Sequence, residues 1–506
     1  MTMKIAGRKP ILIALLLLAT PLLANINIAS LGASAKTNST VTIGFTLEPV
    51  SLDISGVAGQ AIPQVLLNNV YEGLVKVENS GKIVPSLAKS YKASSDGLTY
   101  TFNLTKAKFH DGSNFGAADV VWSFNRVLDP NSTAVLPTQK QQFATVASVK
   151  APNASTVVFA LKNRDNDFLF NLTQRGGVIF KSGSTEFATK ANGTGPFKLG
   201  NWNRGNSITL ERNDNYYGKK ALAKKVVFRY ILDATALSNA ILSGQIDIMS
   251  TVQKPELLSI FKNRKDLKVV SGTTNGEVTL GMNNSKAPLN NIKVRQAIRQ
   301  AINKKALIKT AWAGYGLEIG SFVPPTDPWF EDLSKKYPFD VQAAKNLLKQ
   351  AGYPNGFSIV LDTPPAPYAE ASQEFIAASL KTIGINVSIK PVAWGEWLDR
   401  IFTKANYDMT IVAHVERGDM SIYANPNYYF RFNNTEYQAL IKKASSARTA
   451  AAQTETLKKA ARLLSDESAS DWLFLIPNLQ VAKKSVLGFP ENSVGDAYSV
   501  AAITKG

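Results

Sequence analysis

Apolar positions along the chain recur at the spacings of short strands and amphipathic helices, in alternation. Residues 41–46 and 225–231 are rich in β-branched and aromatic side chains, which predicts buried strands. Residues 60–74 carry apolar side chains three and four positions apart, which predicts a helix. A longer helix is predicted from Ile292, because Asn291 before it is a favourable N-cap. This alternation is typical of α/β lobes.

The second half of the chain contains a strand–helix–strand unit. Its strands are predicted over 357–361 and 385–389, and its helix over 369–382. In the first half, Asp96-Gly97 between two apolar runs predicts a β-hairpin. Further helices are predicted over 117–128, 235–242, 341–350, 436–445 and 450–464, and further strands over 208–210, 246–249 and 472–476.

The first 35 residues have the layout of a secretory signal. Basic residues at the start precede an apolar, uncharged stretch from Ile11 to Ala24, and the small residues Ala33-Ser34-Ala35 follow. An uncleaved membrane anchor is the alternative, because weakly polar residues extend the stretch to Gly32. No later stretch stays apolar for the roughly 18 residues that a membrane span needs. We therefore expect export across the cytoplasmic membrane into the periplasm or cell envelope.

The amino-acid composition excludes several kinds of site and partner for this chain. The chain has no cysteine, which excludes disulfides, thiolate metal sites and a lipoprotein anchor. Lys plus Arg total 57 against 38 acidic residues, a net charge of +19. The basic residues are scattered as doublets such as Lys219-Lys220 and Lys442-Lys443, so we expect a solvated basic surface and no nucleic-acid partner. An anionic cell envelope is one surface that such a charge could face.

Motifs for catalysis are missing from the sequence. There is no nucleophile elbow, phosphate loop or dinucleotide fingerprint, and the two histidines, His110 and His414, lie in no recognisable catalytic setting. We therefore expect neither enzyme activity nor a cofactor. A pair of carboxylates for glycoside chemistry stays open, because such a pair needs closeness in space and not in sequence.

One local cluster combines imidazole and carboxylate. His414 and Glu416 are two positions apart, so on a strand both side chains project from the same face. A metal site, a structural polar network and ligand recognition are all compatible with this pattern. A metal would need further ligands, and the chain offers one other histidine.

Several segments in fixed order resemble the peptide/nickel family of solute-binding proteins of ABC transporters, also described as extracellular solute-binding protein family 5. They span nearly the whole chain beyond the predicted signal. The segments are 71–75 (YEGLV), 83–88 (IVPSLA), 95–102 (SDGLTYTF), 108–112 (KFHDG), 118–120 (ADV), 193–197 (GTGPF), 243–247 (SGQID), 294–298 (VRQAI), 343–348 (AAKNLL), 351–356 (AGYPNG) and 486–489 (VLGF).

The resemblance implies an α/β fold, a two-lobed clamshell of the type II periplasmic-binding-protein class with an extra subdomain in its first lobe. Two crossings of the chain, near Gly281 and near Asn478, would act as hinges. The implied boundaries are 1–35 for the signal, 36–75, 192–278 and 481–506 for the first lobe, 76–191 for the subdomain, and 279–480 for the second lobe.

The resemblance also implies a mechanism without catalysis. A monomer would close its lobes around a peptide and deliver it to a membrane permease that works with ATPase subunits. The peptide would lie extended, pair with main-chain groups of both lobes, and place its ammonium group against a carboxylate of the second lobe. An oligosaccharide or metal chelate as the ligand, a secreted hydrolase, and an envelope-adhering chaperone or signalling protein are the alternatives.

The site residues that the resemblance implies come from two segments. Relatives commonly have Gly-Trp-x-x-Asp in the second lobe, where this chain has Ala413-His-Val-Glu-Arg-Gly-Asp-Met420, with Val415 in place of the tryptophan. Asp419 is the best match to the ammonium-binding acid and Glu416 the second, and 413–415 would pair with the ligand. Leu47 to Ser51, which includes Glu48, would be the first-lobe counterpart.

Aromatic residues near the second segment are candidates for the pocket wall. Trp394 and Trp397 precede it, and a role in the core is as compatible with their positions as a role in the pocket. Tyr423 would line the loop that lengthens this segment in comparison with the relatives.

Overall fold

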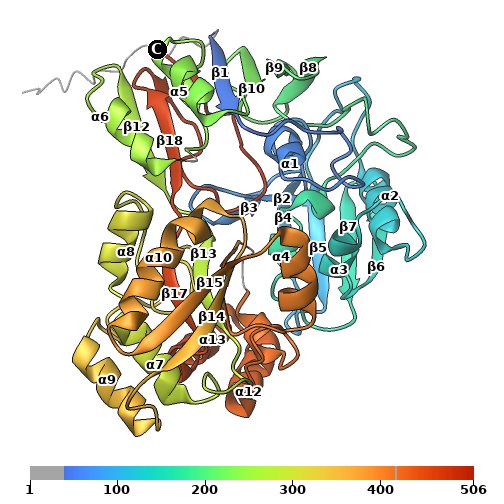
Figure 1. Cartoon of the computed structure of the whole chain (residues 1–506). Helices are drawn as coiled ribbons and strands as arrows, with labels where there is room; N and C mark the ends of the chain where they lie inside the picture. Colours follow the sequence, from blue (N-terminus) through green and yellow to red (C-terminus); the bar gives the residue numbers. More distant parts are fainter. Residues whose placement is uncertain (1–38, 253, 416–418) are drawn as a thin grey trace, which may run out of the picture. The chain divides into compact units, whose positions relative to one another are not determined.

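The first lobe is built on a seven-stranded mixed sheet (Figure 1). The computed structural model describes residues 39–252, 254–415 and 419–506, and Lys36–Gly506 form one compact unit. Central strand β1 runs parallel to both of its neighbours, and its apolar residues Val41 and Ile43 are fully buried. The strand order is β12 (Leu267–Gly272), β18 (Asn478–Lys483), β11 (Ile248–Met249), β1 (Thr40–Phe45), β10 (Lys225–Tyr230), β9 (Ser207–Arg212) and β8 (Phe197–Asn203).

The second lobe contains a five-stranded sheet with helices packed against it. Strands β13 and β17 are buried along their whole length, as expected for a sheet that is covered on both faces. The predicted strand–helix–strand unit is confirmed, because β14 and β15 pair in parallel and α10 (Pro367–Lys381) connects them. The strand order is β15 (Ile385–Pro391), β14 (Phe357–Thr363), β16 (Met409–His414), β13 (Glu277–Met282) and β17 (Ser470–Leu475).

Between the first-lobe strands β1 and β8, the chain forms a four-stranded antiparallel sheet, the subdomain. The hairpin at Asp96-Gly97 is confirmed, and Gly97 has the positive φ of 71° that favours glycine at such a turn. Helix α2 (Ala117–Leu128) begins as predicted, because the Asp119 carboxylate accepts the Gly116 N–H at 2.9 Å. The strand order is β4 (Ala88–Ala93), β5 (Thr99–Leu104), β7 (Thr156–Leu161) and β6 (Val146–Asn153).

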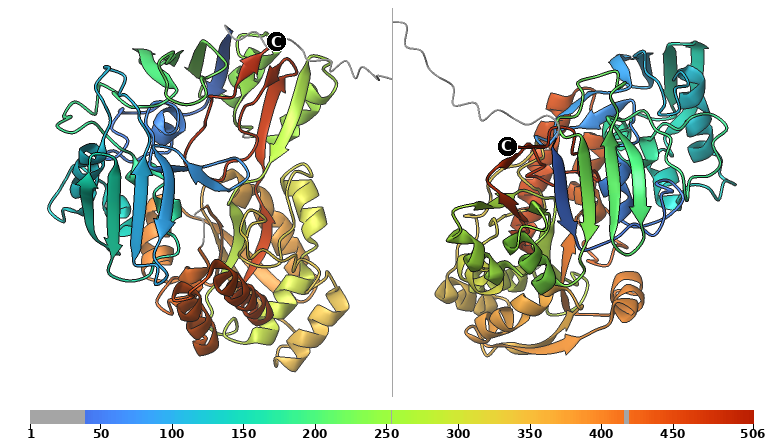
Figure 2. Two further views of the ribbon diagram at one scale, coloured as in Figure 1. Left: turned by 180° about the vertical axis from the view of Figure 1, so that it is seen from behind. Right: turned by 90° about the horizontal axis from the view of Figure 1, so that it is seen from above.

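Two crossings join the lobes, at residues 273–276 between β12 and β13 and at residues 476–477 between β17 and β18. They lie side by side, since the Ile476 N–H donates to Gly276 O at 2.8 Å and the Thr274 hydroxyl to Ile476 O at 2.6 Å. The view from behind in Figure 2 shows both passing between the two sheets. Gly281 lies inside β13, beyond the crossing. The domain boundaries given above stay a prediction.

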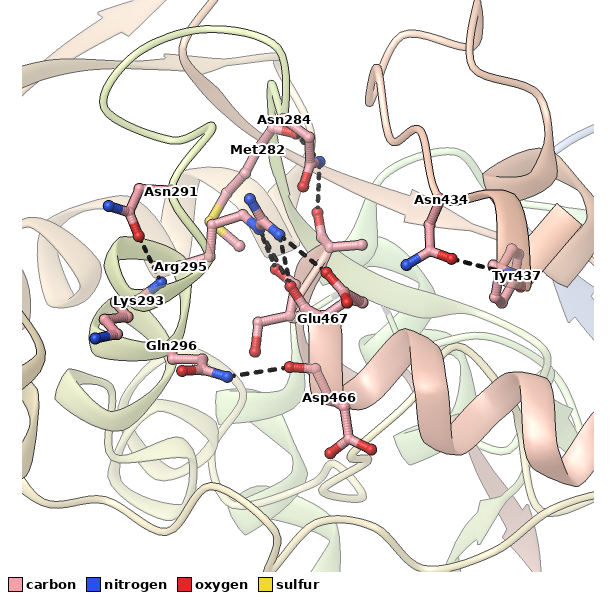
Figure 3. A network of polar contacts seen from close by, with 12 residues as sticks. Met282, Asn284, Asn291, Lys293, Arg295, Gln296, Asn434, Tyr437, Asp466 and Glu467 are labelled. Carbon is pink, nitrogen blue, oxygen red and sulfur yellow. Dashed lines mark hydrogen bonds and ion pairs between the residues drawn. The ribbon is translucent and has the colours of Figure 1, made fainter. Parts of the chain in front are cut away.

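A buried guanidinium fastens helix α7 (Ile292–Ala301) to the end of helix α13 (Ala450–Glu467) in the second lobe (Figure 3). Arg295 is 4% exposed and donates to Glu467 O at 2.8 Å and to Ser468 O at 3.1 Å. The carbonyls at a helix C-terminus lack partners within the helix, so a cation there supplies both hydrogen bonds and a favourable charge. The predicted N-cap of α7 is confirmed, since the Asn291 side chain accepts the Lys293 N–H at 2.9 Å.

The predicted helix over 60–74 is much shorter in the structure. Helix α1 ends at Leu66, because Leu67 is extended and Asn68 has a φ of 62°. The turn brings Asn69 into the core, where its amide donates to Tyr498 O at 2.9 Å and its oxygen accepts the Val500 N–H at 2.9 Å. A contact with the distant C-terminal segment therefore replaces the last turns of the helix.

The remaining elements complete the described chain. Among the described residues, no helix has the length and apolar character that crossing a membrane requires. The other elements are α1 (Ala61–Leu66), β2 (Val75–Val77), β3 (Ile83–Pro85), α3 (Pro137–Gln142), α4 (Phe168–Asn171), η1 (Arg175–Gly177), α5 (Ala234–Leu242), η2 (Pro255–Leu258), α6 (Ser259–Lys262), α8 (Lys304–Ala311), α9 (Val341–Gln350), α11 (Trp394–Glu396), η3 (Trp397–Thr403), η4 (Asp419–Ala424), α12 (Thr435–Ser445), β19 (Val486–Leu487) and β20 (Thr504–Lys505).

Candidate functional site

A cavity of about 700 Å³ lies where the two lobes, the subdomain and both crossings meet. Its walls come from α1 and the C-terminal segment of the first lobe, from α3, α4 and η1 with the residues that flank them, from the crossings, and from the end of β16. Its volume is in the range of small-molecule sites. The lining residues are Gln60, Gln64, Gln142, Asp167, Phe170, Asn171, Gln174, Thr274, Asn275, Gly276, Val415, Ile476, Ser493, Val494, Gly495 and Asp496.

Its position distinguishes this cavity from another of similar size. A cavity of about 720 Å³ is lined by residues of the first lobe and of segment 76–86, such as Lys76, Tyr216 and Ser499. Hinge motion between the lobes would not open or close that second cavity. The cavity at the crossings has Val415 of the second lobe on its wall, so rotation about the crossings changes its size.

Amide side chains dominate the chemistry of the cavity wall. Each of them offers both hydrogen-bond donors and an acceptor. Gln60 and Gln64 stand one turn apart at the start of α1, and Asn171 is held by a hydrogen bond from its Nδ2 to Gln142 O at 3.0 Å. The six amide residues are Gln60, Gln64, Gln142, Asn171, Gln174 and Asn275. Such a wall suits a ligand that itself carries amide groups.

Two carboxylates, Asp167 and Asp496, also line the cavity. Burial raises the pKa of the Asp496 carboxyl, and the nearby Arg175 guanidinium offsets this in part. Gln60 Nε2 lies 3.2 Å from the Asp496 carbonyl oxygen and 3.5 Å from its carboxylate. Asp496 is therefore a partly buried acid that belongs to the first lobe.

The predicted strand at the end of β16 has one residue on the cavity wall. Val415 is 60% exposed and lines the cavity. His414 points the other way into a cluster of rings, where its Nε2 lies 2.9 Å from the Tyr429 hydroxyl and its ring is stacked on Tyr429. Ala413 donates its backbone N–H to the Tyr368 hydroxyl at 3.0 Å. These contacts place His414 in a structural polar network.

The predicted aromatic residues divide between core and surface. Trp397 is buried and donates its indole N–H to Thr410 Oγ1 at 3.0 Å. Tyr423 is also buried, donates to Ser470 Oγ at 2.9 Å and stacks on Phe430. Trp394 is 41% exposed and packs edge-on against Trp397. The described residues that line the cavity include neither of these two tryptophans nor Tyr423.

The first-lobe counterpart lies outside the described cavity wall as well. Leu47 is 61% exposed, and the Glu48 carboxylate accepts the Trp202 indole N–H at 2.7 Å and the Gly205 N–H at 2.9 Å. Glu48 therefore fixes a loop to the β8–β9 hairpin. Glu416 falls outside the described residues, and of Asp419 the structure describes the backbone, which begins η4.

The sequence offered little signal for most of the cavity residues. The amides come from separate segments and belong to no motif, so only folding brings them together. A signal existed at Gln60 and Gln64, which are polar positions at helical spacing in an otherwise apolar helix. In the described parts of the chain, no group of three His, Cys, Asp or Glu side chains is placed to hold a metal ion.

Comparison with known proteins adds an evolutionary context to this geometry. Residues 82–439 match the family described as "Bacterial extracellular solute-binding proteins, family 5 Middle". Heme-binding protein A of Haemophilus influenzae is 30% identical over 472 residues, which cover 83% of this chain and 84% of that protein. The dipeptide-binding protein of Escherichia coli is 30% identical over 366 residues, covering 65% of this chain and 68% of that protein.

A solved structure supports the architecture independently. The ABC transporter-associated periplasmic binding protein DppA of Helicobacter pylori, in complex with the peptide STSA, superimposes with a TM-score of 0.75 at 25% identity. The match covers 92% of this chain and 98% of that one. The predicted fold class, an α/β fold of the type II periplasmic-binding-protein class, is thereby confirmed.

Proposed function

The chain belongs to family 5 of the bacterial extracellular solute-binding proteins, and from this membership we propose that its ligand is a short peptide, captured between the lobes and passed on to an ABC importer. The observation that carries the proposal is the cavity at the crossings with its six amide side chains. A peptide backbone repeats one donor and one acceptor at each residue, so amide side chains can bind it whatever its sequence.

The relatives leave more than one kind of ligand open, and the cavity wall favours one of them. One relative is named for heme and another for dipeptides. Heme presents a wide apolar face, whereas the apolar side chains among the described wall residues are Phe170, Val415, Ile476 and Val494. The amides and carboxylates outnumber them, and an apolar ligand face would displace water from these polar groups without offering hydrogen bonds in return, at a cost in free energy.

Closure around the ligand follows from the two crossings. A ligand in the cavity contacts both lobes only when they are closed, so it stabilises the closed form by the contacts that the open form lacks. The crossings form a narrow, hydrogen-bonded pair of segments about which the lobes can rotate without breaking either sheet. The protein in this proposal releases its ligand chemically unchanged.

Binding residues in the second lobe are part of the proposal. Among the described residues, the pairing of strand β16 with β14 ends at Thr410, and we propose that a ligand strand adds to this edge along residues 411–413. At Ala413 a ligand would have to displace the Tyr368 hydroxyl. Asp419, with Glu416 as the second choice, stays the predicted partner of the ligand's ammonium group. Leu47, Glu48, Trp394, Trp397 and Tyr423 have positions that support scaffold roles better than ligand contact.

The proposal extends to location and partners. We propose that the protein works as a monomer outside the cytoplasmic membrane, where a permease with its ATPase subunits receives the peptide. The predicted signal and the extracellular family support this location. No lipid anchor through cysteine is expected, because the chain contains none.

Thermal unfolding in the presence of synthetic peptides tests the proposal. Purified protein is mixed with pools of di- to pentapeptides, and binding raises the Tm because a ligand that binds only the folded state stabilises it. Small-angle scattering on the same samples should show a smaller radius of gyration as the lobes close. Native mass spectrometry identifies any ligand that co-purifies. A protein that ignores every peptide pool but co-purifies with heme or a sugar would contradict the proposal.

A further inference from the structure

Asp496 and Asp247, two acids of the first lobe, have different surroundings. It lines the cavity between the lobes and comes from the C-terminal segment, after β19. In the described part of the chain the Asp496 carboxylate forms no ion pair, its side-chain partner is the Gln60 amide at 3.5 Å, and the Arg175 backbone N–H also interacts with it. Asp247, by comparison, is neutralised by Lys483 at 2.8 Å and Lys505 at 2.9 Å.

The guanidinium of Arg175, which lies near this carboxylate, donates its hydrogen bonds to other groups. Arg175 donates its Nε to Ile54 O at 2.8 Å and one terminal nitrogen to Val57 O at 2.6 Å, while the other reaches Gly59 O at 3.3 Å. The guanidinium thus fixes the loop before α1 and acts on Asp496 only through space. Each of the three guanidinium nitrogens has a carbonyl partner, and the planar group cannot turn to a new partner without losing those bonds.

The carboxylate therefore lies where a charge is costly, and among the described residues no cationic group forms an ion pair with it. Burial disfavours its charged form, which is the cause of its raised pKa. A positive group brought by a ligand would remove this cost and form a charge-assisted hydrogen bond, among the stronger polar contacts in proteins. A ligand carboxylate at the same place would be repelled.

We propose that Asp496 is a specificity-determining residue of the interlobe cavity, which binds a cationic nitrogen of the peptide and selects against ligands that place a neutral or anionic group there. The inference rests on the proposed function, because it assumes that a peptide enters this cavity. It assigns an anionic contact to the first lobe, in addition to the second-lobe acid that the family resemblance predicts.

The cationic nitrogen has two possible sources, the terminal ammonium group and a lysine or arginine side chain. Four tripeptides separate them. Ala-Ala-Ala and its N-acetylated form differ in the terminal charge, and Ala-Lys-Ala and Ala-Gln-Ala differ in the side-chain charge. Dissociation constants for each are measured by titration calorimetry on the whole protein.

The variant Asp496→Asn removes the charge and keeps an oxygen that can accept from Gln60. We expect it to weaken binding of the peptide with the relevant cation by about tenfold or more, the effect of losing one hydrogen bond between charged groups. The matched peptide without that charge should bind to the variant and to the wild type with the same dissociation constant. Glu491→Gln is the matched control, because it makes the same charge change at an exposed position of the same segment. The Tm of each free variant verifies that it folds.

The outcomes separate the inference from the proposed function. If Asp496→Asn weakens binding of free Ala-Ala-Ala but not of its acetylated form, the terminal ammonium is the group that Asp496 binds. If it weakens binding of Ala-Lys-Ala but not of Ala-Gln-Ala, the lysine side chain is that group. Binding of these peptides that Asp496→Asn leaves within twofold overturns the inference while peptide capture stands. If the wild-type protein binds neither these tripeptides nor any peptide pool, the proposed function fails and the inference with it.

Discussion

A buried cluster of three charged side chains lies in the second lobe, and none of them is on the described cavity wall. Asp471 is fully buried, with its carboxylate 2.8 Å from Lys304 Nζ and 3.5 Å from Arg299 Nε. Burial lowers the pKa of both Lys304 and Arg299, and Asp471 opposes that effect. One carboxylate therefore compensates two cations, and these hold α7 and α8 to β17.

Replacing this carboxylate should be strongly destabilising. In Asp471→Asn the two cations stay buried with a neutral partner, so we expect the free energy of unfolding to fall by about 3–5 kcal/mol. Urea unfolding followed by circular dichroism measures the change. Asp399→Asn, which breaks the exposed pair with Lys404, serves as the control and should be hard to distinguish from wild type. Equal effects of the two substitutions would contradict this account of the cluster.

His110 makes stability depend on pH. Its Nε2 donates to Gly195 O at 3.0 Å, and its Nδ1 is buried without a hydrogen-bond partner in the described part of the chain. Burial lowers its pKa from 6.5 to about 4. Between these values the unfolded chain takes up a proton that the folded chain does not. The stabilisation is complete above pH 6.5 and is lost as the pH falls toward 4.

His110→Gln should flatten this part of the stability profile. Glutamine can keep the hydrogen bond to Gly195 O but does not titrate. Chemical unfolding at pH 4 to 7 should show a wild-type profile that is steeper by up to about 1.4 kcal/mol per pH unit, for one proton. The difference between the two profiles is the readout, because carboxylates contribute equally to both. Parallel profiles would show that His110 titrates normally in the folded protein.

At the scale of the element, the end of α13 depends on a side chain from another helix. Arg295→Met removes the donors to Glu467 O and to Ser468 O, the second of these in a buried hydrogen bond. We expect a loss of roughly 3 kcal/mol in stability, the effect of unmade hydrogen bonds to a charged group. Hydrogen exchange should accelerate first in the last turn of α13. Lys293→Met in the same helix is the control, since Lys293 is exposed.

Local sequence signals predicted most elements well and failed where tertiary contacts decide. The predicted bounds of α2 and α9 are those observed, and the predictions for α7 and α10 agree within a few residues, because each helix has strong periodicity and a clear start or end. The prediction for helix α1 is too long, because the hydrogen bonds that Asn69 forms with Tyr498 and Val500 leave no signal in the local sequence.

The candidate site was harder to predict than the fold. Motif matching led to residues 413–419, of which Val415 reaches the cavity wall, and it could not reveal that His414 turns into the aromatic cluster. Strand alternation put His414 and Glu416 on one face, but only the three-dimensional structure shows which face meets the cavity. Asp496 lies in a segment with no functional motif, so only its surroundings in space identify it.

At the scale of the whole molecule, the subdomain touches the second lobe through segments other than the crossings. In the loop after β7, Asn166 Nδ2 donates to Ala444 O at 3.2 Å and to Ser445 O at 3.3 Å, at the end of α12. Arg164 donates to Arg448 O at 2.9 Å. These contacts exist only while the lobes are together, so they add to the stability of the closed form.

Weakening these contacts between the subdomain and the second lobe should shift the equilibrium between closed and open lobes toward the open form. We expect Asn166→Ala to increase the radius of gyration of the ligand-free protein in small-angle scattering, and to weaken peptide binding about fivefold, as for the loss of one neutral hydrogen bond. Asn163→Ala, at an exposed position of the same loop, should leave both quantities unchanged. Unchanged compaction and affinity in Asn166→Ala would mean that these contacts do not contribute to closure.

The place of β18 in the first sheet has a consequence for biosynthesis. This strand, Asn478–Lys483, lies between β12 and β11, and its neighbour β11 pairs with β1. Because β18 follows the whole second lobe in the sequence, the sheet that starts with β1 cannot be completed before the second lobe has been synthesised. During translation the first sheet therefore stays without the strand that joins β12 to β11 until the second lobe has been made.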